Sequence, residues 1–187
     1  MIFKCGDINF KYAWLDYIVQ DPVHPSIGAY TRITGTRTVF VYAENDEPQY
    51  IVSAKIGSDV SRSIDNILLD DISSKETATF YSIFRVPGST LKGGGGDVLR
   101  LIIDYCKLHG IDNFYTLSPI PFLKNNFYEI PNEEYLIEYL ETKKGPVERF
   151  HLDNSATIAN INYNADVSEL RMEESWGIMV NYKYEKI

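Results

Sequence analysis

Four consecutive glycines are the feature of the sequence that most directly suggests ligand binding: Gly93, Gly94, Gly95 and Gly96. Glycine has no Cβ, so backbone N–H groups in such a loop can approach a ligand closely. The run lies between a β-branched and aromatic segment, residues 77–84, and a segment with helical apolar spacing, residues 98–109. The N-terminus of a helix favours negative charge. We therefore expect the loop from Lys92 to Asp97 to bind an anion such as a pyrophosphate.

The glycine run matches neither of the two common nucleotide-binding motifs. No Gly-Lys-Ser/Thr follows it, as a Walker A loop requires. It also does not lie in the first strand–turn–helix unit of the chain, where a dinucleotide fingerprint would be found. Glycine runs are common in flexible connectors as well. The anion site is therefore a hypothesis that needs support from the rest of the chain.

Ser118 and His151 are the candidates for acid–base chemistry, although neither is diagnostic by itself. A serine before a proline, here Pro119, is often a turn former. Histidine is often a packed or surface residue. The other histidines have weaker claims, because His109 fits the end of a helix and His24 lies in a proline-rich turn. The pair therefore depends on its sequence surroundings.

The neighbouring segments predict the elements that must position these residues. Strands are expected over β-branched or aromatic segments, residues 38–43, 50–56, 77–84 and 113–117. Apolar spacing and composition predict helices over 60–71, 98–109 and 133–141, and a final pair of strands over 156–162 and 177–184. This order indicates an α/β fold (a mixed α+β sheet) in a single domain, residues 1–187.

Composition excludes several functional classes. The chain carries 18 Lys and Arg against 26 Asp and Glu, a net charge of −8, which disfavours nucleic acid binding. No apolar run approaches the ~18 residues of a membrane span. Cys5 and Cys106 match no metal-binding spacing, so we expect no metal and, from the free thiols, a reducing cytoplasmic location. We also expect no secretory signal, because the N-terminus lacks an apolar core.

Two segments around the candidate pair resemble a known family. Residues 115–122, YTLSPIPF, resemble the "SLSPIPGF" signature of malonyl-CoA decarboxylases, and residues 150–156, FHLDNSA, resemble that family's "FHLRNGA". Further matching segments follow in order, so that the resemblance spans roughly residues 22–185. The strand–glycine loop–helix–strand unit also looks like that of the GNAT superfamily, whose equivalent loop binds the CoA pyrophosphate.

The resemblance implies a GNAT-like fold and the conversion of malonyl-CoA to acetyl-CoA and CO2. It implies no cofactor beyond the CoA thioester substrate, with neither metal nor biotin. The family's active-site serine and histidine fall on Ser118 and His151, and its CoA loop falls on Lys92 to Asp97. Ser82, Asn154 and Tyr182 lie in matching segments, and we expect them to contact the substrate.

The sequence departs from the family pattern at several positions. Phe122 follows Pro121 where the family has glycine, Asp153 replaces an arginine, and Ser155 replaces a glycine. The segment between the two motifs is shorter than in the family. The family's N-terminal helical domain, which serves oligomerisation, has no counterpart in these 187 residues, so the oligomeric state stays open.

The chemistry would need an oriented thioester and a proton donor. Loss of CO2 leaves an enolate, whose oxygen is stabilised by hydrogen-bond donors. We expect Ser118 to orient the thioester or carboxylate and His151 to protonate the enolate near neutral pH. Three alternatives remain open. They are a GNAT-type acyltransferase with an amine acceptor, a decarboxylase of malonyl carried on an acyl carrier protein, and a non-catalytic acyl-CoA-binding module. The net charge of −8 weighs mildly against a carrier protein partner.

Overall fold

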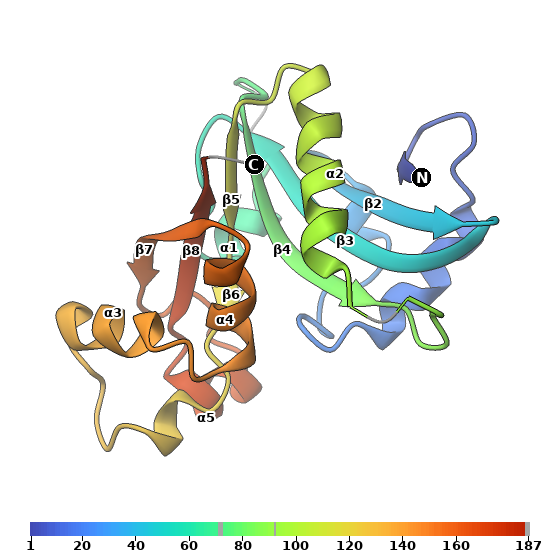
Figure 1. Ribbon diagram of the computed structural model, residues 1–187. Helices are drawn as coiled ribbons and strands as arrows, with labels where there is room; N and C mark the ends of the chain where they lie inside the picture. The colour runs from blue at the N-terminus through green and yellow to red at the C-terminus, as the bar shows by residue number, and fades with distance from the viewer. Residues whose placement is uncertain (71–72, 92, 186–187) are drawn as a thin grey trace. The chain divides into compact units, whose positions relative to one another are not determined.

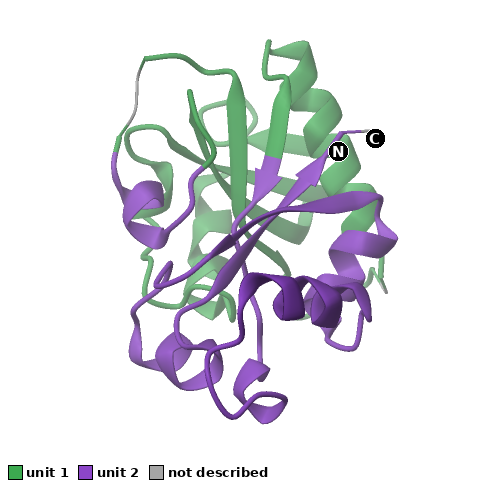
Figure 2. Ribbon diagram, turned by 90° about the vertical axis from the view of Figure 1, so that its left-hand side faces the viewer, with its two compact units in different colours: residues 1–60, 70–114 green, residues 61–69, 115–187 purple. Residues whose placement is uncertain are grey.

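The computed structural model describes residues 1–70, 73–91 and 93–185, which fall into two compact units (Figures 1 and 2). Unit 1 comprises residues 1–60 and 70–114, and unit 2 comprises residues 61–69 and 115–187. Lys92, an expected member of the anion loop, lies outside the described residues. That the whole chain folds as a single domain stays a prediction.

Unit 1 contains four antiparallel strands that are neighbours in chain order. They are β1 (Ile2–Lys4), β2 (Arg37–Glu44), β3 (Glu47–Gly57) and β4 (Thr77–Arg85). The β2–β3 hairpin turns at Asn45 and Asp46, whose φ angles of 50° and 69° are those that a tight hairpin requires. The expected strands 38–43, 50–56 and 77–84 are confirmed, each slightly longer than predicted.

The two faces of the β2 strand contact different parts of unit 1. Val39 and Val41 point into a buried cluster that includes Trp14 of the 3₁₀ helix η1 (Tyr12–Gln20). A second short 3₁₀ helix, η2, covers Thr31–Ile33. Phe40 faces the other way, and its ring meets Tyr105 of helix α2 edge-on at 5.8 Å. This alternation is the period of two expected for a strand buried on both faces.

Helix α2 (Gly95–Leu108) is amphipathic and buries a stripe of apolar side chains: Val98, Leu99, Ile102, Ile103 and Cys106. The predicted helix 98–109 therefore begins three residues too late. Gly94 precedes the helix with φ of 84°, a left-handed conformation that glycine adopts without steric cost. Gly95 and Gly96 are thus part of the first helical turn rather than of the loop.

Unit 2 is built on strand β8 (Met179–Tyr184). Both β6 (Ser118–Pro119) and β7 (Ala156–Asn162) pair with it in antiparallel fashion. Strand β5 (Asn113–Thr116) carries the chain into this unit from unit 1. The strand expected at 177–184 starts at Met179 instead, because Trp176 and Gly177 adopt left-handed φ angles of 53° and 70° that end the preceding helix.

The helices of unit 2 were only partly expected. They are α1 (Ile64–Leu68), α3 (Glu133–Glu141), α4 (Pro146–Asp153) and α5 (Glu169–Ser175), with a 3₁₀ turn η3 at Leu123–Asn125. Helix α3 has the predicted bounds. Helix α1 is shorter than the predicted 60–71, because Ser63 caps its start by accepting a hydrogen bond from the Asn66 N–H, and the backbone is extended at Leu69. Helices α4 and α5 were not predicted.

Two negative findings apply to the described residues. None of their helices has the length and apolar character needed to cross a membrane. Within residues 1–70, 73–91 and 93–185, no group of three or more His, Cys, Asp or Glu is arranged to hold a metal ion.

The predicted α/β class is confirmed by the mixture of strands and helices in the chain.

Candidate active site

Ser118 and His151 meet inside unit 2. The Ser118 Oγ atom lies 2.9 Å from Nε2 of His151, and 33 residues separate the two in sequence. Both side chains are buried, with 7% and 4% of their surfaces exposed. The sequence-predicted pair is therefore in hydrogen-bond contact in a site from which water is largely excluded.

Helix α4 carries His151 to this contact. Pro146 occupies its first turn, where the missing N–H costs no helical hydrogen bond. The buried Glu148 carboxylate accepts a hydrogen bond from the Gly145 N–H and so secures the start of the helix. At the other end, the Asn154 amide donates to the Phe150 carbonyl at 2.7 Å. Both ends of an eight-residue helix are thus fixed around the imidazole.

The other nitrogen of His151 is held by strand β8. Its Nδ1 atom lies 2.8 Å from the Tyr184 hydroxyl, and the ring stacks on Tyr182 with centroids 4.5 Å apart and an interplanar angle of 23°. Tyr182 and Tyr184 are two residues apart and therefore share one face of the strand. The imidazole has contacts at both nitrogens and on one ring face, which fixes its orientation.

Ser118 is also held from a second side. Its hydroxyl donates to Thr116 Oγ1 at 3.0 Å, and the same threonine oxygen accepts from the Tyr182 N–H at 3.3 Å. The Thr116 carbonyl accepts from the buried Asn181 amide at 2.7 Å. A continuous chain of hydrogen bonds therefore runs from Thr116 through Ser118 and His151 to Tyr184.

Burial determines the charge state of this chain. It lowers the pKa of His151 from its usual 6.5 to about 3, because a desolvated imidazolium is unfavourable. Burial also raises the pKa of the Tyr184 phenol, which stays protonated. The imidazole is neutral at pH 7, with only one N–H to donate.

The hydrogen bonds favour one tautomer of that neutral imidazole. With the Ser118 hydroxyl donating to Thr116, the serine oxygen can accept from Nε2–H of His151. Nδ1 then accepts from the protonated Tyr184 hydroxyl. This arrangement leaves the imidazole N–H on the side of Ser118, where it can be delivered to a substrate that displaces the serine contact.

The glycine run forms the start of α2 in unit 1. Gly93 and Gly94 both have left-handed φ angles, 81° and 84°, and the Tyr50 hydroxyl donates to the Gly93 carbonyl at 2.7 Å. The first-turn N–H groups of an α-helix have no partner within the helix, so they can bind an anion. Asp97, another expected loop residue, pairs with Arg100 at 2.8 Å on the exposed face of the helix.

The three expected substrate contacts have different surroundings. Ser82, on β4, donates to the buried Asp21 carboxylate at 2.7 Å, and Asp21 in turn pairs with the fully buried Arg32. Asn154 caps the end of α4, and Tyr182 stacks on His151. Tyr182 and Asn154 therefore belong to the surroundings of the imidazole, whereas Ser82 belongs to a buried ion-pair cluster of unit 1. Their roles toward a substrate stay predictions.

Departures from the family motifs have local structural consequences. Phe122 and Ser155, which stand where the motifs have glycine, both adopt left-handed φ angles of 61° and 65°. The backbone conformation that favours glycine is thus present at both positions, at a cost of roughly 1–2 kcal/mol each. Asp153, in place of arginine, is exposed and pairs with Lys143 at 2.7 Å. Its carboxylate is therefore partly neutralised by a neighbouring cation.

Sequence reasoning missed three residues of the site: Thr116, Asn181 and Tyr184. For Thr116 and Tyr184 the signal was the period of two in a strand. Thr116 lies two residues before Ser118, and Tyr184 lies two residues after Tyr182. Asn181 faces the opposite side of β8, and its side-chain amide donates to the backbone carbonyl of Thr116, so no local pattern would have revealed it.

Comparison with known proteins supports the resemblance. Residues 132–187 match the family model described as the malonyl-CoA decarboxylase C-terminal domain. This segment contains His151 and the whole of α3, α4, β7, α5 and β8. The resemblance to this family is thereby confirmed over residues 132–187. No curated protein matches the chain.

Solved structures share the fold. Malonyl-CoA decarboxylase from Agrobacterium vitis superimposes with a TM-score of 0.78 and 22% identity, over 100% of this chain and 60% of that chain. The loading GNATL domain of CurA from Lyngbya majuscula gives a TM-score of 0.70 and 15% identity, over 98% of this chain and 97% of that one.

A third structure, the GNAT-like decarboxylase GphF in complex with isobutyryl-CoA, gives a TM-score of 0.70 and 15% identity, with 98% of both chains covered. The fold is therefore GNAT-like, as predicted. This chain spans about three fifths (60%) of the length of the Agrobacterium vitis enzyme.

Proposed function

We propose that this chain decarboxylates malonyl-CoA, or a related malonyl thioester, to acetyl-CoA and CO2. Ser118 orients the thioester or carboxylate, and His151 protonates the enolate. The observation that carries the proposal is the buried 2.9 Å contact between Ser118 Oγ and His151 Nε2. It is supported by the match of residues 132–187 to a malonyl-CoA decarboxylase domain and by the GNAT-like fold.

The first step breaks the bond between the α-carbon and the carboxylate. Its electron pair moves onto the thioester, giving an enolate, and CO2 leaves. A hydrogen-bond donor aimed at the enolate oxygen lowers the barrier, and one such donor is typically worth roughly 10²–10³ in rate. The Ser118 hydroxyl can turn from Thr116 to this oxygen while it keeps its contact with His151. The thioester itself accepts the electrons, so the step uses no cofactor beyond the CoA thioester.

The second step transfers a proton to the α-carbon. Because burial holds the pKa of His151 at about 3, the donor is the neutral imidazole N–H and not an imidazolium. A neutral imidazole is a weak acid, but an enolate carbon is a strong enough base to take its proton. The Tyr184 hydroxyl at Nδ1 stabilises the negative charge that develops on the ring. Solvent then returns one proton to the site, which balances the proton that the reaction consumes.

The glycine run is the proposed site of the CoA pyrophosphate. The free N–H groups in the first turn of α2 carry the positive end of the helix dipole. Gly93 and Gly94 have no side chain that would keep a phosphate oxygen away from the backbone. Lys92 and Asp97 complete the predicted set, Lys92 as an added cation and Asp97 through its backbone.

An acyl carrier protein is the second candidate carrier. The net charge of −8 opposes long-range attraction of an acidic carrier. We therefore favour a CoA thioester as substrate. An amine acyltransferase is a weaker candidate than a decarboxylase. In the favoured tautomer of His151, Nε2 carries the proton and has no free lone pair toward Ser118 with which to act as a base.

The proposal is tested by incubating the protein with malonyl-CoA and following the products by mass spectrometry. Acetyl-CoA should form without any added acceptor. Methylmalonyl-CoA in a parallel reaction defines the acyl group, and malonyl on an acyl carrier protein defines the carrier. A product in which malonyl or acetyl is attached to an added amine, with no acetyl-CoA in the absence of amine, would replace this proposal with acyl transfer.

A further inference from the structure

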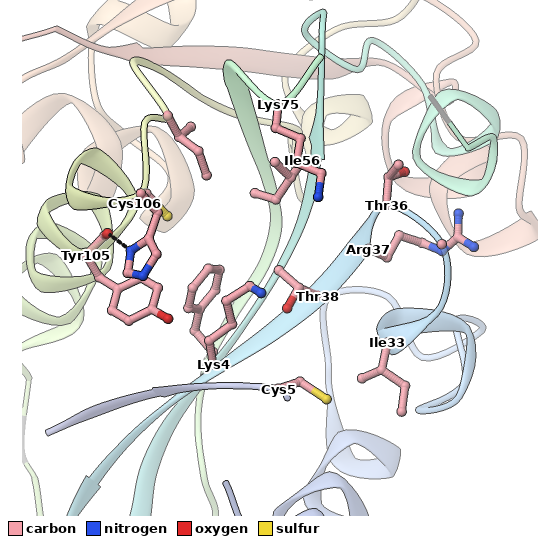
Figure 3. A pocket seen from close by; sticks show the side chains of 14 residues that line it. Lys4, Cys5, Ile33, Thr36, Arg37, Thr38, Ile56, Lys75, Tyr105 and Cys106 are labelled. Atoms are coloured by element: carbon pink, nitrogen blue, oxygen red, sulfur yellow. Dashed lines mark hydrogen bonds between the residues drawn. The ribbon is translucent and has the colours of Figure 1, made fainter. Parts of the chain in front are cut away.

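Unit 1 contains a cavity that the proposed chemistry does not use. Its volume is about 510 Å³, within the usual range for a small-molecule site. Figure 3 shows Tyr105 and Cys106 of helix α2 on one side of it, and Ile33, Thr36 and Arg37 across from them. Lys4 and Lys75 extend into the space between these two sides.

The strand register explains why the cavity is there. Lys4 of β1 pairs directly with Phe40 of β2, so both side chains point to the face that α2 covers. The Phe40 ring fills the space beneath Tyr105. Two residues earlier on the same face, Thr38 is too small to do so. The gap between Thr38 and the last turns of α2 is left open, and His109 and Ile111 border it.

The charge of the cavity is opposite to that of the chain. Lys4, Arg37 and Lys75 line it, and none of its fourteen lining residues is Asp or Glu, in a protein of net charge −8. Arg37 already pairs with Asp70 at 3.1 Å. No ion pair of the Lys4 or Lys75 ammonium is found in the part of the chain that the structure describes. Two cations are therefore available to an anionic ligand.

The remaining wall is apolar. Phe40, Ile56 and Ile111 line it and are buried. The buried Cys106 adds a neutral thiol, because burial raises its pKa to about 12. A ligand that fits would place an anionic group near Lys4 and Lys75 and an apolar body against these side chains.

We propose that this cavity is a binding site for a small amphipathic anion, a carboxylate or phosphate on a short apolar body. It is separate from the glycine run, because Tyr105 lies ten residues beyond Gly95, about 15 Å along the axis of α2. The site is independent of the proposed decarboxylation and would be present in a protein with a different activity.

Cys5 reports on the occupancy of the site. It lines the cavity and is only partly buried, whereas Cys106 is buried with a thiol pKa of about 12, so alkylating reagents should modify Cys5 first. The full-length protein is treated with iodoacetamide in the presence of octanoate, octyl phosphate, octanol or inorganic phosphate, and peptide masses give the rate at Cys5. Octanoate or octyl phosphate should slow the reaction at least about tenfold, and the more effective of the two identifies the anionic group.

Two variants and a second reagent separate charge from shape. Lys4→Gln and Lys75→Gln should each weaken protection by about tenfold, whereas Lys144→Gln, an exposed lysine of unit 2, should leave it unchanged. The ratio of the Cys5 alkylation rate with anionic iodoacetate to the rate with iodoacetamide should be higher in the wild type than in Lys4→Gln. Equal protection by octanol would overturn the anionic assignment, and equal protection by inorganic phosphate would overturn the apolar one. No protection by any of the four would overturn the site itself.

Discussion

The Nδ1 atom of His151 lies 2.8 Å from the Tyr184 hydroxyl, and this contact sets the chemistry available at the opposite nitrogen. A protonated phenol that donates to Nδ1 leaves the single proton of the neutral imidazole on Nε2, which faces Ser118 at 2.9 Å. The site is therefore organised as a neutral donor in a desolvated setting, not as an imidazolium that exchanges protons with solvent at pH 7.

Removing the imidazole should stop the proton transfer. We predict that His151→Ala lowers the rate of CO2 release from malonyl-CoA by at least roughly 10²–10⁴, the usual contribution of a positioned acid–base group. CoA binding, measured by calorimetry, should survive, because the glycine run is untouched. The matched control is Arg149→Ala, an exposed neighbour on the same helix, which should keep its activity. Normal turnover in His151→Ala would remove His151 from the mechanism.

Tyr184→Phe tests the positioning role of the phenol. Loss of one hydrogen bond to Nδ1 frees the ring to change tautomer, and the expected cost is about tenfold in kcat with KM for malonyl-CoA little changed. The ¹⁵N shifts of the His151 ring should report a mixture of tautomers in the variant and one tautomer in the wild type. Tyr128→Phe, at a fully exposed tyrosine, serves as the control. Identical ¹⁵N spectra for wild type and Tyr184→Phe would contradict the tautomer assignment.

The depressed pKa of His151 has a consequence for stability. Between about pH 3 and 6.5 the unfolded chain binds a proton at this residue and the folded chain does not. The free energy of unfolding should therefore be highest above pH 6.5 and fall as the pH drops toward 3, by up to about 1.4 kcal/mol per pH unit from this residue.

Urea unfolding at several pH values checks this slope. The wild type should lose more stability on acidification than His151→Gln, which carries no titrating ring. Because the pKa of His151 is about 3, this residue should cause no inflection in the pH–activity profile of the wild type between pH 6 and 8. Parallel stability curves for the two proteins would mean that the imidazole charges within the folded state.

At the glycine run, the left-handed backbone conformation should determine the effect of a Gly→Ala substitution more than steric contact with neighbouring atoms does. Gly94→Ala forces an L-residue to φ of 84° and brings its Cβ within 3.1 Å of a Leu91 methyl group. Gly88→Ala is the matched control, because its φ is 87° and open space surrounds the added Cβ. Both variants should lose roughly 1–2 kcal/mol of stability, but only Gly94→Ala should weaken CoA binding. CoA should also slow hydrogen exchange at Gly93–Gly96. Unchanged exchange there would show that the pyrophosphate binds elsewhere.

Local patterns predicted the scaffold better than the site. The strands 38–43, 50–56 and 156–162 and helix α3 follow from β-branched content or apolar spacing, which depend on neighbours in sequence. Helix α4, which carries His151, has only eight residues, and its buried positions are the polar Glu148 and His151. Such a helix has no apolar stripe to reveal it, since tertiary contacts determine its existence.

The partners of the candidate pair could be predicted only in part. Thr116 lies two residues before Ser118, which is a local signal, whereas Tyr184 on β8 meets His151 on α4 across 33 residues of sequence, and such a contact depends on the fold. The resemblance singled out the two residues, but the charge state of His151 follows from the burial of its ring, which motif comparison does not describe.

The most direct test of the central claim is the reaction of the wild-type protein with malonyl-CoA in D2O, with Ser118→Ala alongside. Decarboxylation by the proposed route predicts acetyl-CoA that carries one solvent deuterium on its methyl group, at a rate roughly 10²–10³ lower in Ser118→Ala. A reaction without protein controls for spontaneous exchange of the substrate. Recovery of intact malonyl-CoA from the wild type, or equal rates in the two proteins, would contradict the account.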